Sequence, residues 1–242
     1  MPLSTLSGGQ QWSPLALAPL ACYLAEPEYL EFGVVAASVA TWRDASPNKN
    51  HIESTQRPTF VPGGWGNGRP AVVFDGLANV IGTSVGSICS AMGGADAPFS
   101  VFMIVQLDTS ADHGLVEWDD SGGLATSQLR TNFGATETLR YNRIDDAASA
   151  ATVTGTTELG TSKRALFYVF PGTTCSTYVN GNLDLDASAC NVGTLTINRF
   201  RLGQTTVGQL DGSLAACVIF SRALNALERD QLYRWGAGAW GY

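Results

Sequence analysis

Apolar residues occur along the chain in short runs, most of them bounded by Gly, Pro, Asn or Asp. Residues 99–107 (FSVFMIVQL) are almost continuously apolar, as expected for a central strand that is buried on both faces. Residues 174–180 alternate between polar and apolar positions, which is typical of a strand with one face in water. Turn signals recur about every 8–12 residues, a spacing that favours a β-sandwich or barrel. The candidate strands lie at residues 71–75, 99–107, 115–118, 124–133, 165–170, 174–179, 194–202 and 214–220.

One helix is predicted, near the C-terminus. Asn225 and Glu228 have the spacing of a capping box, in which each side chain accepts a hydrogen bond from the other residue's backbone N–H. Leu227, Leu232 and Trp235 can share one face of this helix. The chain has no repeat of fixed period and no long linker. We therefore expect an all-β fold, a two-sheet antiparallel jelly-roll sandwich with a short C-terminal helix.

Composition supports one folded domain and argues against several classes of protein. The chain has 242 residues, of which 45% are hydrophobic and 14% charged, so its apolar content suffices for a core. A net charge of −7 without a Lys/Arg cluster argues against binding to nucleic acid. No apolar run reaches about 18 residues, so we expect no membrane insertion. We assign residues 1–11 to an N-terminal arm, a candidate docking segment, and residues 12–242 to a single jelly-roll domain.

The N-terminal region contains an apolar stretch that resembles the central part of a signal peptide, at residues 13–25. No Lys or Arg occurs between Met1 and Arg43, so the positively charged leader segment is missing. We therefore expect synthesis in the cytoplasm without a secretory signal peptide.

Five cysteines leave at least one thiol unpaired. Cys175 and Cys190 flank Asn180-Gly181, the strongest two-residue hairpin signal. Continuing outward from this turn places Cys175 opposite Asp186, which is four residues from Cys190. That offset is about 13 Å along a strand, whereas a disulfide needs Cα atoms closer than about 7 Å. Unless the chain doubles back after Asp186, we expect no bridge. Without CxxC spacing and with only two histidines, a zinc site is not expected either.

Several segments have a familiar order and spacing. They are residues 12–20 (WSPLALAPL), 41–51 (TWRDASPNKNH), 57–61 (RPTFV), 68–76 (GRPAVVFDG), 210–224 (LDGSLAACVIFSRAL) and 228–232 (ERDQL). Together they resemble the laminin-G-like, concanavalin A-like lectin-glucanase jelly-roll domains of bacterial and phage proteins, over essentially the whole chain. Where that family usually has S-G-N-G, this chain has Ser46-Pro47-Asn48-Lys49, which changes the shape of the loop. The resemblance implies the fold more strongly than the function, because this fold hosts lectins, hydrolases, lyases and adhesive modules.

The candidate catalytic residues are Glu117 and Asp119. Glycoside hydrolases with a related jelly roll place three acids at alternate positions of one strand, in the order Glu-x-Asp-x-Glu, so that all three share a face. In this chain the third position is Ser121, so the second carboxylate that protonates the leaving oxygen is missing. The alternative is a solvated, acidic strand end, and we favour a protein that is not an enzyme.

Two pairs of adjacent aspartates are the metal candidates. Asp119 with Asp120 and Asp145 with Asp146 could supply carboxylate ligands to calcium, which related jelly rolls often bind at the rim of the sandwich. The alternative is turn chemistry, because Asp side chains in loops bond to nearby backbone N–H groups. We expect no required cofactor, with calcium as the only candidate.

Sugar binding would use exposed aromatic rings. Trp65 lies in the glycine-rich segment 62–68 and is the most exposed-looking tryptophan, while Trp118 and Tyr141 lie near strand ends. For each ring the alternative is packing inside the domain.

We expect a non-catalytic recognition or structural module, a phage virion component such as a decoration, fibre or tail protein. It would bind a cell-surface glycan or other virion proteins and could form a homo-oligomer. The location expected is a virion or an extracellular assembly. The alternatives are a polysaccharide-active enzyme, either a glycoside hydrolase or a lyase, and a free calcium-dependent lectin.

Overall fold

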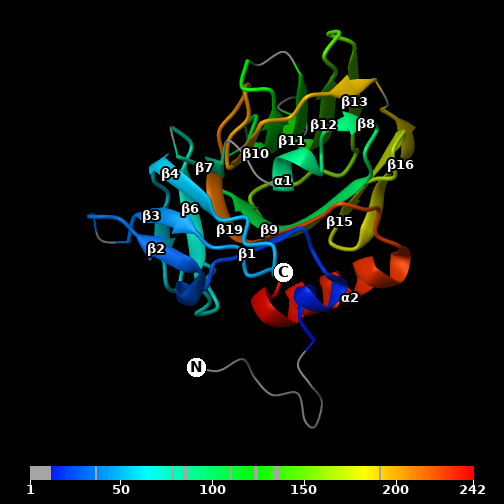
Figure 1. The fold of residues 1–242 in the computed structure, drawn as a ribbon. Coiled ribbons are helices and arrows are strands. Elements are labelled where there is room, and N and C mark those ends of the chain that lie inside the picture. Colours follow the sequence, from blue (N-terminus) through cyan, green and yellow to red (C-terminus); the bar gives the residue numbers. More distant parts are fainter. Residues whose placement is uncertain are drawn as a thin grey trace.

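Short apolar runs separated by turns build two antiparallel sheets that pack face to face, with helix α2 (Ala226–Trp240) beneath them (Figure 1). The computed structural model describes residues 12–35, 37–77, 79–83, 87–109, 111–122, 125–132, 137–190 and 192–242. The predicted docking arm, residues 1–11, lies outside the described residues. The expected all-β sandwich with a C-terminal helix is confirmed.

The sheet nearer to α2, which we call sheet A, has eight strands. Its order is β16 (Asn182–Ala189), β15 (Thr174–Val179), β14 (Arg164–Phe170), β9 (Phe99–Leu107), β19 (Asp211–Phe220), β6 (Ala71–Asp75) and β5 (Thr59–Val61), with β1 (Ala21–Leu24) paired to β19 beside β6. The predicted central strand 99–107 is confirmed as β9, which lies between β14 and β19.

The opposite sheet, sheet B, has nine strands. Its order is β13 (Ala150–Thr154), β12 (Thr138–Ile144), β11 (Thr126–Asn132), β10 (Gly114–Asp119), β18 (Arg199–Leu202), β7 (Val80–Thr83), β4 (Ile52–Gln56), β3 (Val39–Trp42) and β2 (Leu30–Phe32). The remaining elements are a ribbon of β8 (Gly94–Ala95) and β17 (Thr194–Leu195) and the short helices η1 (Pro14–Leu17), η2 (Pro27–Tyr29) and α1 (Ser87–Ser90). The prediction of one strand over 194–202 is therefore wrong, because β17 and β18 belong to different sheets.

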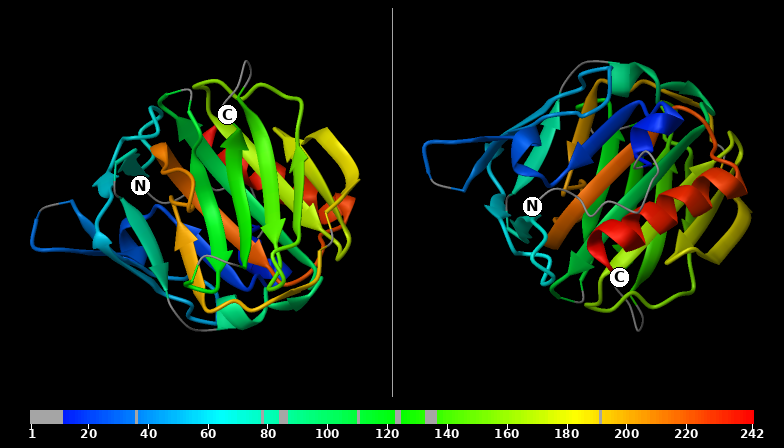
Figure 2. Two further views of the ribbon diagram at one scale, coloured as in Figure 1. Left: turned by 90° about the horizontal axis from the view of Figure 1, so that it is seen from above. Right: turned by 90° about the horizontal axis from the view of Figure 1, so that it is seen from below.

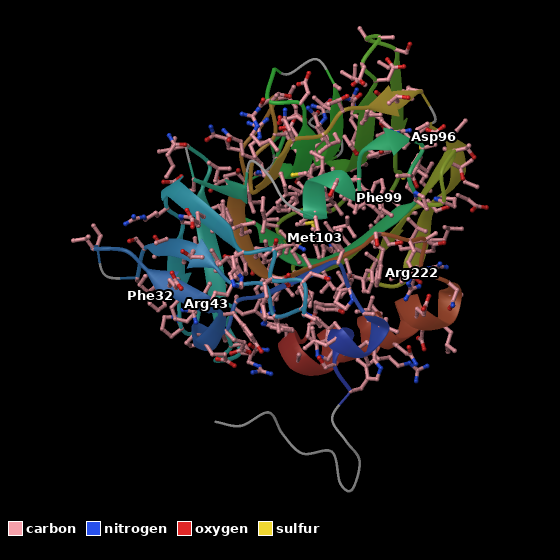
Figure 3. The ribbon with its side chains drawn as sticks, viewed as in Figure 1. Phe32, Arg43, Asp96, Phe99, Met103 and Arg222 are labelled. Carbon is pink, nitrogen blue, oxygen red and sulfur yellow. The ribbon has the colours of Figure 1, made fainter. Side chains whose placement is uncertain are left out.

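The main core lies between the two sheets and is rich in aromatic rings. Phe99 and Met103 of β9 point into it (Figure 3). The ring of Phe99 packs against Trp118 of β10 with 5.8 Å between centroids, and Trp118 packs against Phe200 of β18 at 5.3 Å. These contacts link sheet A to sheet B and fix which side of each strand faces inward.

Helix α2 begins with the predicted capping box, in which Asn225 and Glu228 bond to each other's backbone N–H. Leu232 is fully buried in a second apolar cluster between α2 and sheet A. Leu227, in contrast, is 67% exposed. The prediction that it shares the buried face is wrong, because five residues of an α-helix turn the chain about 140° beyond a full turn. Within the described residues, no helix is long and apolar enough to cross a membrane.

The hairpin of β15 and β16 turns at Asn180-Gly181, as predicted, with both residues at positive φ. Its register differs from the prediction. Two irregularities, between Cys175 and Thr177 and between Thr177 and Tyr178, place Cys175 opposite Ser188 instead of Asp186. Bulges of this kind insert unpaired residues into one strand, and the count outward from a turn cannot reveal them.

Candidate functional site

The two outward faces of the sandwich differ in what covers them. Helices α2 and η1 lie over sheet A (Figure 2, right). Over the outward face of sheet B, no helix is present among the described residues (Figure 2, left). Side chains on that face therefore meet solvent or neighbouring loops, and it is the face on which a ligand can approach the sheet.

Alternation along β10 determines which side chains reach this open face. Val116 and Trp118 point into the core, so Glu117 and Asp119 point outward. Cross-strand register extends the position of Glu117 across the whole sheet, one residue for each strand. We call this set the polar row: Glu31, Thr41, Glu53, Gly82, Arg201, Glu117, Gln128, Asn142 and Thr152.

Two arginines of β18 neutralise the two acids of β10. Arg199 donates to both oxygens of Asp119, with Nε–Oδ1 at 2.8 Å and Nη2–Oδ2 at 3.0 Å. Nη2 of Arg201 donates to Oδ2 of Asp119 at 2.7 Å and also to Oε2 of Glu117. Oε1 of Glu117 accepts from Nε2 of Gln128 at 2.7 Å. The sheet thus holds a hydrogen-bonded network of two carboxylates and two guanidinium groups.

The prediction that Glu117 and Asp119 share a face is confirmed, and the oxygens of both carboxylates are engaged in this network. Both side chains are buried. Burial raises the pKa of Glu117, and the positive charge of Arg201 opposes that rise. Arginine and glutamine donors occupy the oxygens that a nucleophile or a general acid would have to present to a substrate. In this arrangement the two acids position Arg199 and Arg201.

Beside the network lies an open cleft with a volume of about 520 Å³. Gly82 forms part of its floor, between Glu53 on one neighbouring strand and Arg201 on the other. A Cβ atom at Gly82 would lie 2.3 Å from the carbonyl oxygen of Phe200, so glycine is required for β7 and β18 to pair this closely. Thr41 and Arg57 also line the cleft.

The three aromatic rings predicted to stack on sugars are all fully buried. Lys163 covers Trp65, with its Nζ 5.4 Å from the ring centroid. Trp118 points inward because its neighbours in β10 point outward. Tyr141 packs in the core, and its hydroxyl lies 3.1 Å from that of Ser127. The expectation that these rings are exposed is wrong, so they are not available for stacking on a ligand.

The predicted metal ligands do not form a cluster. Arg199 and Arg201 occupy the oxygens of Asp119, as described above. Oδ1 of Asp120 accepts from the N–H of Gly122 at 2.9 Å, and Oδ1 of Asp145 accepts from that of Ser149 at 2.7 Å. Asp146 accepts from the N–H and the hydroxyl of Thr196, both at 2.8 Å. The described part of the chain contains no group of three or more His, Cys, Asp or Glu residues that could hold a metal ion.

Sequence reasoning missed Arg199, Arg201, Glu53 and Gly82. The segment Arg199-Phe200-Arg201-Leu202 alternates between charged and apolar residues, and this pattern marks a strand with one polar face. It would have singled out the two arginines, although not their partners.

The fold is that of a two-sheet antiparallel β-sandwich, and comparison with known proteins adds structural neighbours but no relatives by sequence. No protein-family model matches the chain, and no curated protein matches its sequence. Among solved structures, Trypanosoma rangeli sialidase in complex with 2,3-difluoro-KDN is similar at a TM-score of 0.59 and 15% identity, over 93% of this chain and 33% of the sialidase. The chain thus spans about a third of the length of that enzyme.

Two smaller domains match over most of their own length. Domain 4 of AbnA, an extracellular GH43 arabinanase from Geobacillus stearothermophilus solved with arabinotriose, has a TM-score of 0.62 and 13% identity, over 90% of this chain and 97% of that domain. The CBM40 domain of Ruminococcus gnavus IT-sialidase, bound to α2,3 sialyllactose, has a TM-score of 0.50 and 14% identity, over 68% of this chain and 95% of that domain. At these identities the likeness shows the fold alone.

Proposed function

We propose that the cleft and the polar row on sheet B bind a carbohydrate, and that the chain acts as a glycan-binding module without catalysis. The observation that carries this proposal is the position of Gly82 between Glu53 and Arg201. Sugar hydroxyls both donate and accept hydrogen bonds, so they suit a floor without a side chain that is flanked by an acceptor and a donor. The cleft volume of about 520 Å³ lies within the usual range for small-ligand sites.

The structural neighbours support this proposal. Two similar domains were solved with an oligosaccharide bound, arabinotriose in one and α2,3 sialyllactose in the other. Recognition in this chain would be mainly polar, because the aromatic rings expected from the sequence are buried. Arg199 and Arg201 are held in place by buried acids, so little conformational entropy would be lost when they bind a ligand.

A glycan array probed with the labelled chain, followed by calorimetric titration of the best-bound glycan, tests the proposal. Glu53→Gln keeps the shape of an exposed cleft residue but removes its charge. We expect this change to weaken binding about tenfold, because a hydrogen bond to a charged acceptor is lost. The matched control is Glu158→Gln, an exposed acid outside the cleft and the polar row, which should change affinity less than about twofold.

Absence of binding across the array, or equal affinities of Glu53→Gln and the wild type, would contradict the proposal. The same titration in calcium and in EDTA tests the calcium prediction, since a bound calcium ion would make affinity or melting temperature fall with chelator. The narrower prediction of a phage virion component rests on the sequence resemblance. Capsid and tail genes next to the gene for this chain would support it, and homo-oligomerisation stays a prediction of the same kind.

A further inference from the structure

The hairpin of β15 and β16, at one edge of sheet A, brings two cysteines together. Cys175 lies opposite Ser188, and the backbone N–H of Cys190 donates to the carbonyl of Thr173 at 3.1 Å. Cys175 and Cys190 are therefore diagonal neighbours on the same side of the hairpin, a relation in which the Cα atoms lie about 7–8 Å apart. The bulges in this hairpin create the arrangement, because without them Cys175 would lie opposite Asp186.

Both thiols face the core between the sheets. Cys175 is 1% exposed and Cys190 is 0% exposed. The neighbouring thiol of Cys190 and burial together raise the pKa of Cys175 well above its usual range. A disulfide needs Cα atoms closer than about 7 Å, so closing the bond requires a small movement of the hairpin backbone as well as rotation of the two side chains.

The other three cysteines have no such partner. Cys22 and Cys217 lie in the paired strands β1 and β19, but Cys217 faces the core between the sheets and Cys22 faces the apolar cluster between α2 and sheet A. A disulfide between them would have to pass through the sheet. Cys89 lies apart, on α1. All five cysteines are thiols in this structure.

We propose that Cys175 and Cys190 form an intramolecular disulfide when the chain folds in the presence of a small-molecule disulfide such as oxidised glutathione. One cysteine thiolate attacks the glutathione disulfide, which releases one glutathione and leaves a mixed disulfide. The second cysteine thiolate attacks the protein sulfur of that intermediate and releases the second glutathione. Two electrons and two protons pass from the cysteines to the two glutathione thiols.

Burial controls when this reaction occurs. Neither thiol is accessible in the folded chain, and a raised pKa leaves little of Cys175 as the reactive thiolate. Oxidation is therefore expected during folding, or slowly during local opening of the edge hairpin. Once formed, the bond closes a loop of about 15 residues and should raise the melting temperature by about 5–10 °C.

Refolding the reduced full-length chain in oxidised and reduced glutathione, or in dithiothreitol, tests the proposal. Residues 165–199 form one tryptic peptide that carries both cysteines, because no Lys or Arg lies between Ala165 and Asn198. After alkylation in denaturant, the glutathione sample should yield this peptide without alkyl groups and lighter by two hydrogen atoms. Cys22, Cys89 and Cys217 should all be alkylated. In dithiothreitol every cysteine should be alkylated.

Variants separate the disulfide from general effects of oxidation. Cys190→Ser should lose the glutathione-dependent rise in melting temperature, and Cys190→Ala serves if the serine variant does not fold. The control Cys89→Ser should keep the rise, because Cys89 takes no part in the bond. Full alkylation of the peptide after refolding in glutathione would overturn the proposal, and so would a bond to any other cysteine. Neither result would bear on carbohydrate binding, since the hairpin is not part of the cleft.

Discussion

The outward faces of sheets A and B differ in polarity and in what covers them. The central strands of sheet A, β14, β9 and β19, are apolar on both sides, and the chain buries their outward side with α2 and with aromatic rings such as Trp65 and Trp240. Sheet B carries acids, arginines and amides on its outward side and leaves it without a helix among the described residues. The outward face of sheet A is packed against α2, and the outward face of sheet B carries polar and charged groups. We therefore expect substitutions on the first face to change mainly the free energy of unfolding, and substitutions on the second face to change glycan affinity as well.

The largest expected effect comes from the covered face. Leu232→Ala removes a fully buried side chain between α2 and sheet A and leaves a cavity. We expect a loss of about 3–4 kcal/mol in the free energy of unfolding, measured by urea denaturation. Glycan affinity at the cleft should not change while the variant is folded.

The control for this change is Leu227→Ala on the same helix. Leu227 is 67% exposed, so the same substitution should cost less than about 0.5 kcal/mol. If the two variants were equally destabilised, α2 would not be packed against sheet A as described.

A smaller loss is expected from the network on the open face. Asp119→Asn removes the buried charge that Arg199 and Arg201 share. We expect a cost of about 2 kcal/mol in urea denaturation, below the upper range for breaking a buried ion pair, because Arg201 keeps Glu117 and Arg199 is partly exposed. Glycan binding should weaken as well, because both arginines lose the group that positions them.

Asp146→Asn is the matched control, because Asp146 is exposed and its carboxylate accepts from the backbone N–H and the hydroxyl of Thr196, with no ion pair to it in the described part of the chain. It should cost less than about 1 kcal/mol. If glycan affinity were unchanged in Asp119→Asn, the arginines would not contribute to the site.

Much of this comparison could be predicted from local sequence. The capping box at Asn225 and Glu228 depends on residues three apart, and the common face of Glu117 and Asp119 depends on alternation in one strand. Both were confirmed because neither requires knowledge of distant contacts. The same alternation also dictates that Trp118 faces inward, and it should have excluded that ring from the list of candidate ligand-binding residues.

What could not be predicted depends on residues far apart in the sequence. Arg199 pairs with an aspartate 80 positions earlier, because β18 inserts between β7 and β10. Trp65 is buried by Lys163 and by the C-terminal end of α2, where Asn67 donates to the carbonyl of Trp240 at 2.7 Å. A glycine-rich segment signals a turn, but the segment itself does not say what packs over the turn.

The smallest expected effect is the pH dependence of stability, for which we compare Glu117 on sheet B with Glu228 at the start of α2. Burial raises the pKa of Glu117 in the folded chain. The stability that Glu117 adds through this shift is therefore fully present below its unfolded pKa of about 4.3, and it is lost as pH rises through its folded pKa. Relative to the wild type, Glu117→Gln should gain stability over that interval, on the order of 1 kcal/mol for each unit of pKa difference. Urea denaturation from about pH 4 to 8 measures this change.

Glu228 at the start of α2 should behave in the opposite way. A hydrogen bond from Arg222 lowers its pKa, so its contribution is present above the unfolded pKa and is lost as pH falls through the folded pKa. Glu228→Gln should therefore lose stability relative to the wild type as pH rises from the acidic side. Parallel curves for wild type and Glu117→Gln would show that Arg201 and Gln128 fully offset the burial of Glu117. Glu117 would then contribute equally to stability at every pH, whereas Glu228, whose pKa is lowered, would still contribute more above its unfolded pKa than below it.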